Sequence, residues 1–95
     1  MSIRYTKRAR QELRQAAQWW LENRQESADA FERELRHAFY ILLAHPHMGQ
    51  QIAHLKNVRR LHVSRLKSFL YYRPDSNGLL ILALWHTSRG ADPGL

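Results

Sequence analysis

The chain has 95 residues, with 15 Lys and Arg against 8 Asp and Glu, no Cys and a net charge of +7. This length fits one domain over residues 1–95, and the lack of Cys excludes disulfides, thiolate metal sites and cysteine nucleophiles. No segment has the roughly 20 apolar residues of a membrane span, and no apolar signal-peptide core is visible, so we expect a cytoplasmic protein without a membrane partner.

The first half of the chain has the pattern of a strand followed by two helices. Residues 2–5 alternate apolar and polar side chains, as a short strand does, and Thr6 is a suitable N-cap for a helix over about residues 7–25. Ser27 is the corresponding cap of a second helix, whose apolar residues recur at helical spacing until Pro46 ends it. Because the link between the helices is short, we expect an antiparallel helical hairpin, followed by a loop.

The second half of the chain changes to the period of strands. Residues 58–63 alternate, residues 67–73 are rich in aromatic side chains, and turn-forming residues 74–78 lead into an apolar strand over residues 79–86. That last strand is apolar on both faces, which predicts a buried place inside a sheet. We therefore expect an α+β fold in two layers: a short N-terminal strand, the helical hairpin, and a three-stranded antiparallel meander with the helices on one sheet face.

The residue types of common catalytic sites are poorly represented. The six His residues are scattered, and without Cys or nearby carboxylates we expect no metal site and no cofactor. His86 and Ser88 lie two residues apart on an extended strand, without a third group to orient the imidazole as a base. Asp75 lies in a turn and Asp92 in the last residues, so we expect no carboxylate pair on the sheet.

The clearest functional feature is a basic half of the chain without acidic side chains. No Asp or Glu occurs over residues 35–74, and such a surface favours a polyanion or an acidic protein as partner. Two exposed tyrosines among the arginines would suit RNA, but we expect Tyr71 or Tyr72 to be in the core. Trp20 is in phase with the apolar stripe of the first helix, which places Trp19 at its edge, where it either packs or anchors a partner. We expect target or partner contacts from Arg59, Arg60, Arg65, Lys67, Arg73, His86, Arg89 and Trp19.

Five short motifs follow one another along the chain. They are the helical spacing of Phe31, Leu35, Ala38 and Leu42, then Pro46-x-Met48-Gly49, Val58-Arg59-Arg60-Leu61, Leu70-Tyr71-Tyr72-Arg73, and Leu82 to Arg89. Their order and spacing resemble those of the RelE/ParE toxin superfamily of type II toxin–antitoxin systems, over essentially the whole chain. The WHTSRG run at residues 85–90 is closer to the ParE, plasmid-stabilisation branch than to the RelE branch.

The resemblance implies a toxin that a cognate antitoxin neutralises, typically a ribbon-helix-helix protein whose disordered C-terminal segment folds onto the toxin. ParE-like members are associated with inhibition of DNA gyrase, whereas RelE-like members are ribosome-dependent mRNA endonucleases, many with a tyrosine near the C-terminus. No tyrosine follows Arg89 here, which favours the ParE-like function without catalysis. The alternative is an endoribonuclease that uses His86 for proton transfer, with Arg89, Arg65 and Arg60 stabilising negative charge on the phosphate.

Overall fold

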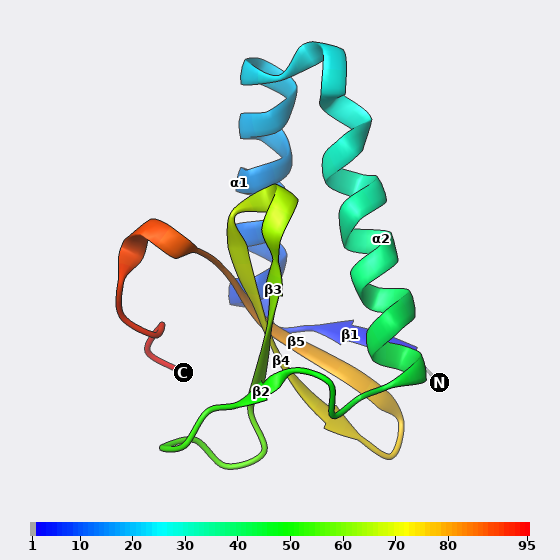
Figure 1. Cartoon of the computed structure of the whole chain (residues 1–95), viewed down its shortest axis with the longest axis vertical. Coiled ribbons are helices and arrows are strands. Elements are labelled where there is room, and N and C mark those ends of the chain that lie inside the picture. The colour runs from blue at the N-terminus through cyan, green and yellow to red at the C-terminus, as the bar shows by residue number, and fades with distance from the viewer. Residues whose placement is uncertain (1) are drawn as a thin grey trace.

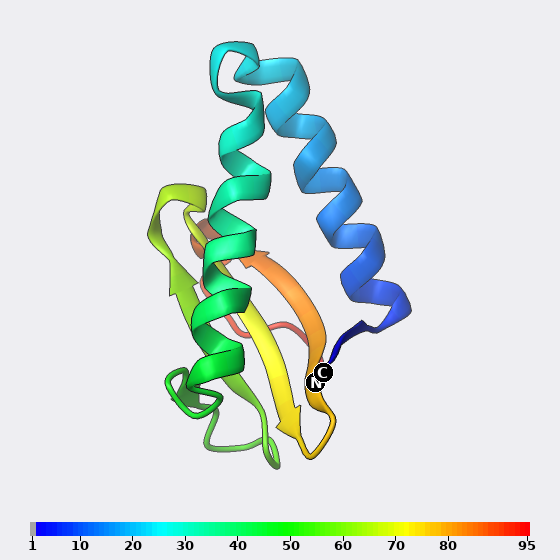
Figure 2. The same ribbon diagram turned by 90° about the vertical axis from the view of Figure 1, so that its right-hand side faces the viewer.

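The structure, a computed structural model, describes residues 2–95 apart from the side chains of Glu26 and Ala28. In chain order the elements are β1 (Ser2–Tyr5), α1 (Lys7–Asn23), α2 (Ala28–Ala44), β2 (Gln50–Gln51), β3 (Arg59–Val63), β4 (Ser68–Asp75) and β5 (Gly78–His86). The strands form one sheet in the order β1-β5-β4-β3-β2, and α1 and α2 pack together on one of its faces (Figures 1 and 2). The α+β architecture, the helical hairpin and the meander β3-β4-β5 are confirmed.

Two strands take places in the sheet that the sequence pattern does not specify. β1 pairs in parallel with β5, with Ser2 opposite Gly78 and Tyr5 opposite Ile81. β2 falls where the sequence predicts a loop, and its two residues pair antiparallel with the start of β3. Because β5 thus lies between β1 and β4, it is an interior strand, as its apolar sequence predicts.

The two helix starts differ in their capping. The hydroxyl of Thr6 accepts a hydrogen bond from the Ala9 backbone N–H at 3.0 Å, which confirms Thr6 as the N-cap of α1. Ser27 stands at the predicted cap position of α2, but its side chain makes no capping hydrogen bond. The reason is that Ser27 ends a 3₁₀ turn (Gln25–Ser27) and has a ψ of 26°, instead of the extended backbone of a capping residue. No helix within residues 2–95 is both long enough and apolar enough to cross a membrane.

Both faces of the sheet carry a packed core. The larger core lies against the helices and includes Ala9, Phe31, Leu35, Leu42, Leu70, Tyr72, Leu79 and Ile81. The opposite face, called the second face below, holds a smaller cluster of Ile52, Val58, Tyr71, Leu82 and Ala83. A β-bulge adds Leu82 to β5 between the pairs Tyr71–Ala83 and Tyr72–Ile81, so the adjacent Leu82 and Ala83 both join the second cluster.

Tyr71 and Tyr72 are both buried, although the sequence predicts only one of them in the core. Neighbouring residues of a strand point to opposite faces, and here each face is covered, one by the helices and the other by residues around Ile52 and Val58. The expected stacking of RNA bases on an exposed tyrosine at this position is therefore excluded.

Replacing Tyr72 with Phe is expected to lower the free energy of unfolding by about 1–3 kcal/mol. The buried hydroxyl donates to the Pro46 carbonyl at 2.7 Å and accepts from the Gly49 N–H at 2.9 Å, and Phe would leave both without a partner. Urea denaturation of the two proteins measures the difference. Tyr40→Phe is the control, since Tyr40 is 73% exposed and its loss of a hydroxyl should change stability by less than about 0.5 kcal/mol.

Candidate functional site

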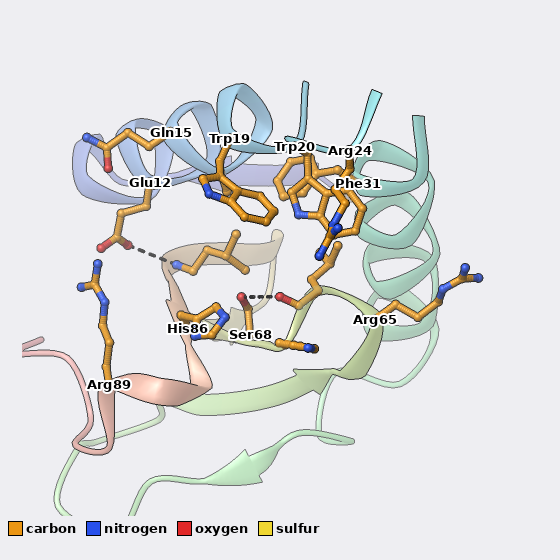
Figure 3. A pocket seen from close by; sticks show the side chains of 14 residues that line it. Glu12, Gln15, Trp19, Trp20, Arg24, Phe31, Arg65, Ser68, His86 and Arg89 are labelled. Atoms are coloured by element: carbon orange, nitrogen blue, oxygen red, sulfur yellow. Dashed lines mark hydrogen bonds between the residues drawn. The ribbon is translucent and has the colours of Figure 1, made fainter. Parts of the chain in front are cut away.

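A cleft of about 700 Å³ lies between α1 and one end of the sheet, where β4 begins and β5 ends. Its α1 wall carries the rings of Trp19 and Trp20, which face Ser68 and His86 across the opening (Figure 3). Basic side chains stand around it: Arg24, Arg65, Lys67 and Arg89. The cleft therefore combines an aromatic wall with a positively charged rim.

The cleft exists because the helices are longer than the sheet. In Figures 1 and 2 both helices extend past the end of the strands, so the second half of α1 has no strand beneath it. Trp20 packs against the core and against Phe31, with 6.5 Å between ring centroids, whereas Trp19 is 50% exposed. The predicted positions of the two tryptophans relative to the apolar stripe are confirmed. The ring of Trp19 packs edge-on against Trp20, with 6.1 Å between the ring centroids. The Arg24 guanidinium lies 5.8 Å from the ring centre of Trp19.

The connection between β3 and β4 brings basic residues to the cleft. Arg65 belongs to a 3₁₀ turn (Ser64–Leu66), and Lys67 reverses the chain with a left-handed φ of 51°. The Lys67 carbonyl then accepts a hydrogen bond of 2.9 Å from the N–H of Thr87, just after β5. This bond fixes Arg65 and Lys67 beside His86 and Arg89, although about 20 residues separate the two pairs in the sequence.

One edge of β5 borders the cleft without a neighbouring strand. β1 ends at Tyr5, opposite Ile81, so in the part of the sheet that the structure describes this edge of β5 has no neighbouring strand beyond Ile81. The Glu12 carboxylate takes over as acceptor and receives the Leu84 N–H at 3.1 Å. Arg8 lies 3.3 Å from Glu12 and offsets the negative charge of this carboxylate. The rim of the cleft therefore carries more positive than negative charge.

His86 is held by its own chain. The expected extended spacing of His86 and Ser88 is wrong, because β5 ends at His86 and a 3₁₀ turn (Thr87–Arg89) folds Ser88 back. The Nδ1 atom of His86 accepts the Ser88 backbone N–H at 3.1 Å and lies 2.8 Å from its hydroxyl. In a neutral imidazole with Nδ1 as acceptor, Nε2 carries the proton, so the second nitrogen offers a donor and not a base.

Five of the predicted contact residues thus line one cleft, and three do not. The five are Trp19, Arg65, Lys67, His86 and Arg89. Arg59 donates to the carbonyls of His47 and Gly49, at 3.1 and 2.8 Å, and so holds the loop after α2. Arg73 is exposed on β4 toward the β4–β5 turn, five residues or about 17 Å along the strand from Ser68 at the cleft.

Arg60 lies on the second face and binds the carboxylate of Asp92, a residue that the sequence does not predict to reach the sheet. The chain returns to the sheet after Arg89, and Asp92 contacts the Arg60 guanidinium at 3.1 Å and accepts the Tyr71 hydroxyl at 2.5 Å. Burial, followed by the hydrogen bond to Asp92, raises the pKa of Tyr71, so its hydroxyl remains a donor. Sequence patterns miss this contact because it joins an irregular segment to a strand 32 residues away. Among the side chains that the structure describes, no three His, Asp or Glu gather as metal ligands would.

A family model matches the sequence, and a solved structure is similar in fold. The sequence model of the ParE toxin of the type II toxin–antitoxin system, parDE, matches residues 3–90. The fold is similar to a solved structure of the chromosomal ParDE toxin–antitoxin system from P. aeruginosa, with a TM-score of 0.71. That likeness covers 90% of this chain and 95% of the other at 19% sequence identity, and therefore shows the fold alone. No curated protein sequence matches the chain.

Proposed function

The chain belongs to the ParE toxin family of type II toxin–antitoxin systems, and from this we propose that it inhibits growth by binding DNA gyrase and is neutralised by a cognate antitoxin. The observation that carries the proposal is the cleft beside α1, where exposed tryptophan and several cations meet. Such a combination suits a protein partner, because aromatic and arginine side chains dominate the binding energy of protein interfaces.

The antitoxin is proposed to be a ribbon-helix-helix protein whose disordered C-terminal segment orders in the cleft. Trp19 and Trp20 offer apolar area to an amphipathic segment, and Arg65, Lys67 and Arg89 offer donors to its acidic side chains. The free energy of ordering the segment has to be offset by this contact. The net charge of +7 on the chain favours an acidic partner and accelerates its association.

The arrangement of the four residues assigned to the nuclease alternative supports binding over phosphodiester cleavage. His86, Arg89 and Arg65 line the cleft, but Arg60 is on the second face with Asp92 as its partner. The hydrogen bond from Ser88 to Nδ1 of His86 also opposes a role of this imidazole as general base. A gyrase-binding toxin requires neither a base nor a catalytic set.

Purified toxin is expected to inhibit DNA supercoiling by gyrase while a reconstituted translation system keeps its rate. Addition of the antitoxin should restore supercoiling. If saturating toxin leaves supercoiling intact and instead cleaves mRNA on the ribosome, the gyrase proposal is wrong. In that case His86→Ala and Arg89→Ala should both abolish the cleavage, and His86→Ala should leave the affinity for the antitoxin nearly unchanged.

A further inference from the structure

The second face of the sheet holds an irregular segment, residues 90–95, that is bound through a regular set of polar contacts. The Trp85 indole N–H donates to the Ala91 carbonyl at 2.7 Å, and Arg8 donates to the Gly94 carbonyl at 2.8 Å. Between these two carbonyls, Asp92 contacts Arg60 and Tyr71, and Pro93 is buried. The second face thus contacts four groups of the segment in chain order: the Ala91 carbonyl, the Asp92 carboxylate, the Pro93 ring and the Gly94 carbonyl.

Aromatic rings orient two arginines on this face, and one of them, Arg60, binds the carboxylate of the segment. The Arg60 guanidinium lies 4.1 Å from the ring centre of Phe69, and the Arg89 guanidinium lies 4.2 Å from that of Trp85. Phe69 and Trp85 pair across β4 and β5, so the two arginines stand on one row of rings. An arginine backed by an aromatic ring loses less freedom on binding a carboxylate, because its guanidinium is already oriented.

The contacts that hold residues 90–95 on the second face contribute little binding free energy. Ala91, Gly94 and Leu95 are exposed, and both partners of the Arg60–Asp92 ion pair are 27% exposed. An ion pair with this access to solvent contributes little to stability, since water and salt screen it. Only Pro93 adds a buried side chain. A competing segment with the same groups therefore has little binding energy to overcome.

From this geometry we propose that the second face is a binding site for an acidic polypeptide segment of a partner protein, which residues 91–94 of the chain itself occupy and thereby regulate. A polypeptide is favoured over nucleic acid because two of the contacts read backbone carbonyls on either side of the carboxylate. Bases would also find the ring faces of Phe69 and Trp85 covered by arginine. Arg89 also lines the cleft beside α1, but the four side chains that contact the segment do not: Arg8, Arg60, Tyr71 and Trp85. The test of this site therefore does not depend on the identity of the toxin's target.

The site is tested by opening it in the full chain with Asp92→Lys, which places like charges at Arg60. The probe is a blocked synthetic peptide of residues 90–95, added up to millimolar concentration while NMR records the indole resonances of the three tryptophans. The peptide is expected to shift Trp85, to leave Trp19 and Trp20 unchanged, and to bind this variant at least about tenfold more tightly than the unmodified chain. The tethered segment acts at a high effective concentration and so competes with the probe.

Three comparisons make the outcome decisive. Asp29→Lys makes the same change in net charge on the exposed surface of α2 and should bind the peptide as weakly as the unmodified chain. Arg60→Gln added to Asp92→Lys should remove binding, as should a peptide with Asn in place of its Asp. Equal affinity for the open and unmodified chains, or tighter binding of an eight-residue oligothymidylate than of the peptide, would overturn the proposal.

Discussion

Arg65→Glu is expected to weaken binding of the antitoxin by about thirtyfold or more, the largest effect of any single charge change at the cleft. Arg65 is exposed on a short turn and lines the cleft with Lys67 and Arg89, so the change costs little in folding. A glutamate at this place would face the acidic side chains of the proposed antitoxin segment, and repulsion between like charges would oppose docking. Isothermal titration calorimetry with the purified antitoxin measures the change.

Arg73→Glu is the matched control for this prediction. It makes the same change in net charge on an exposed strand residue, but at the other end of β4 from the cleft. The antitoxin affinity should fall by no more than the few-fold that a change in overall charge produces, and the difference should shrink at high salt. An equal loss of affinity in both variants would mean that net charge, and not the cleft, decides antitoxin binding.

Gly78→Ala is expected to lower the free energy of unfolding by about 3 kcal/mol or more, and the melting temperature by roughly 15 °C. A Cβ at this residue would lie 2.0 Å from the Ser2 carbonyl oxygen and 2.8 Å from its nitrogen, so β1 would have to move away from β5. The φ of +128° is also unfavourable for any residue with a side chain. Differential scanning calorimetry measures both quantities.

Two other glycines separate the causes of that loss. Gly90 has a φ of +76° but open space around its Cβ position, so Gly90→Ala should cost only the backbone strain, about 1 kcal/mol. Gly94 lies in open space as well and has no positive φ, so Gly94→Ala should be nearly neutral. If Gly78→Ala were no more destabilising than Gly90→Ala, the close contact between β1 and β5 would not contribute as described.

Local signals predict the elements well where each one carries its own pattern. Thr6 caps α1 as predicted, α2 ends just before Pro46, and the apolar run of β5 becomes an interior strand. These features depend on residues close in sequence, for which propensity and periodicity are informative. The two-residue β2 has no pattern of its own and forms only because β3 offers it an edge, so the sequence predicts a loop there.

The candidate site shows the same division between local and distant contacts. The sequence predicts partner contacts from Trp19, Arg65, Lys67, His86 and Arg89. It does not predict that these residues share a cleft that Arg59, Arg60 and Arg73 do not line. The grouping depends on the hydrogen bond between Thr87 and Lys67, and on helices longer than the sheet beneath them. Neither feature produces a periodic pattern in the sequence from which it could be predicted.

The sequence by itself determined the α+β element order and the basic character of the surface, because periodicity is a property of neighbouring residues and composition a property of the chain. Its motifs also carried the resemblance to the family. Only the tertiary structure decided which cations act together, that both Tyr71 and Tyr72 are buried, and that Asp92 neutralises Arg60. These outcomes follow from the cover of both sheet faces and from contacts between residues far apart in sequence. Both depend on how distant segments pack against one another, and a local sequence pattern carries no information about that packing.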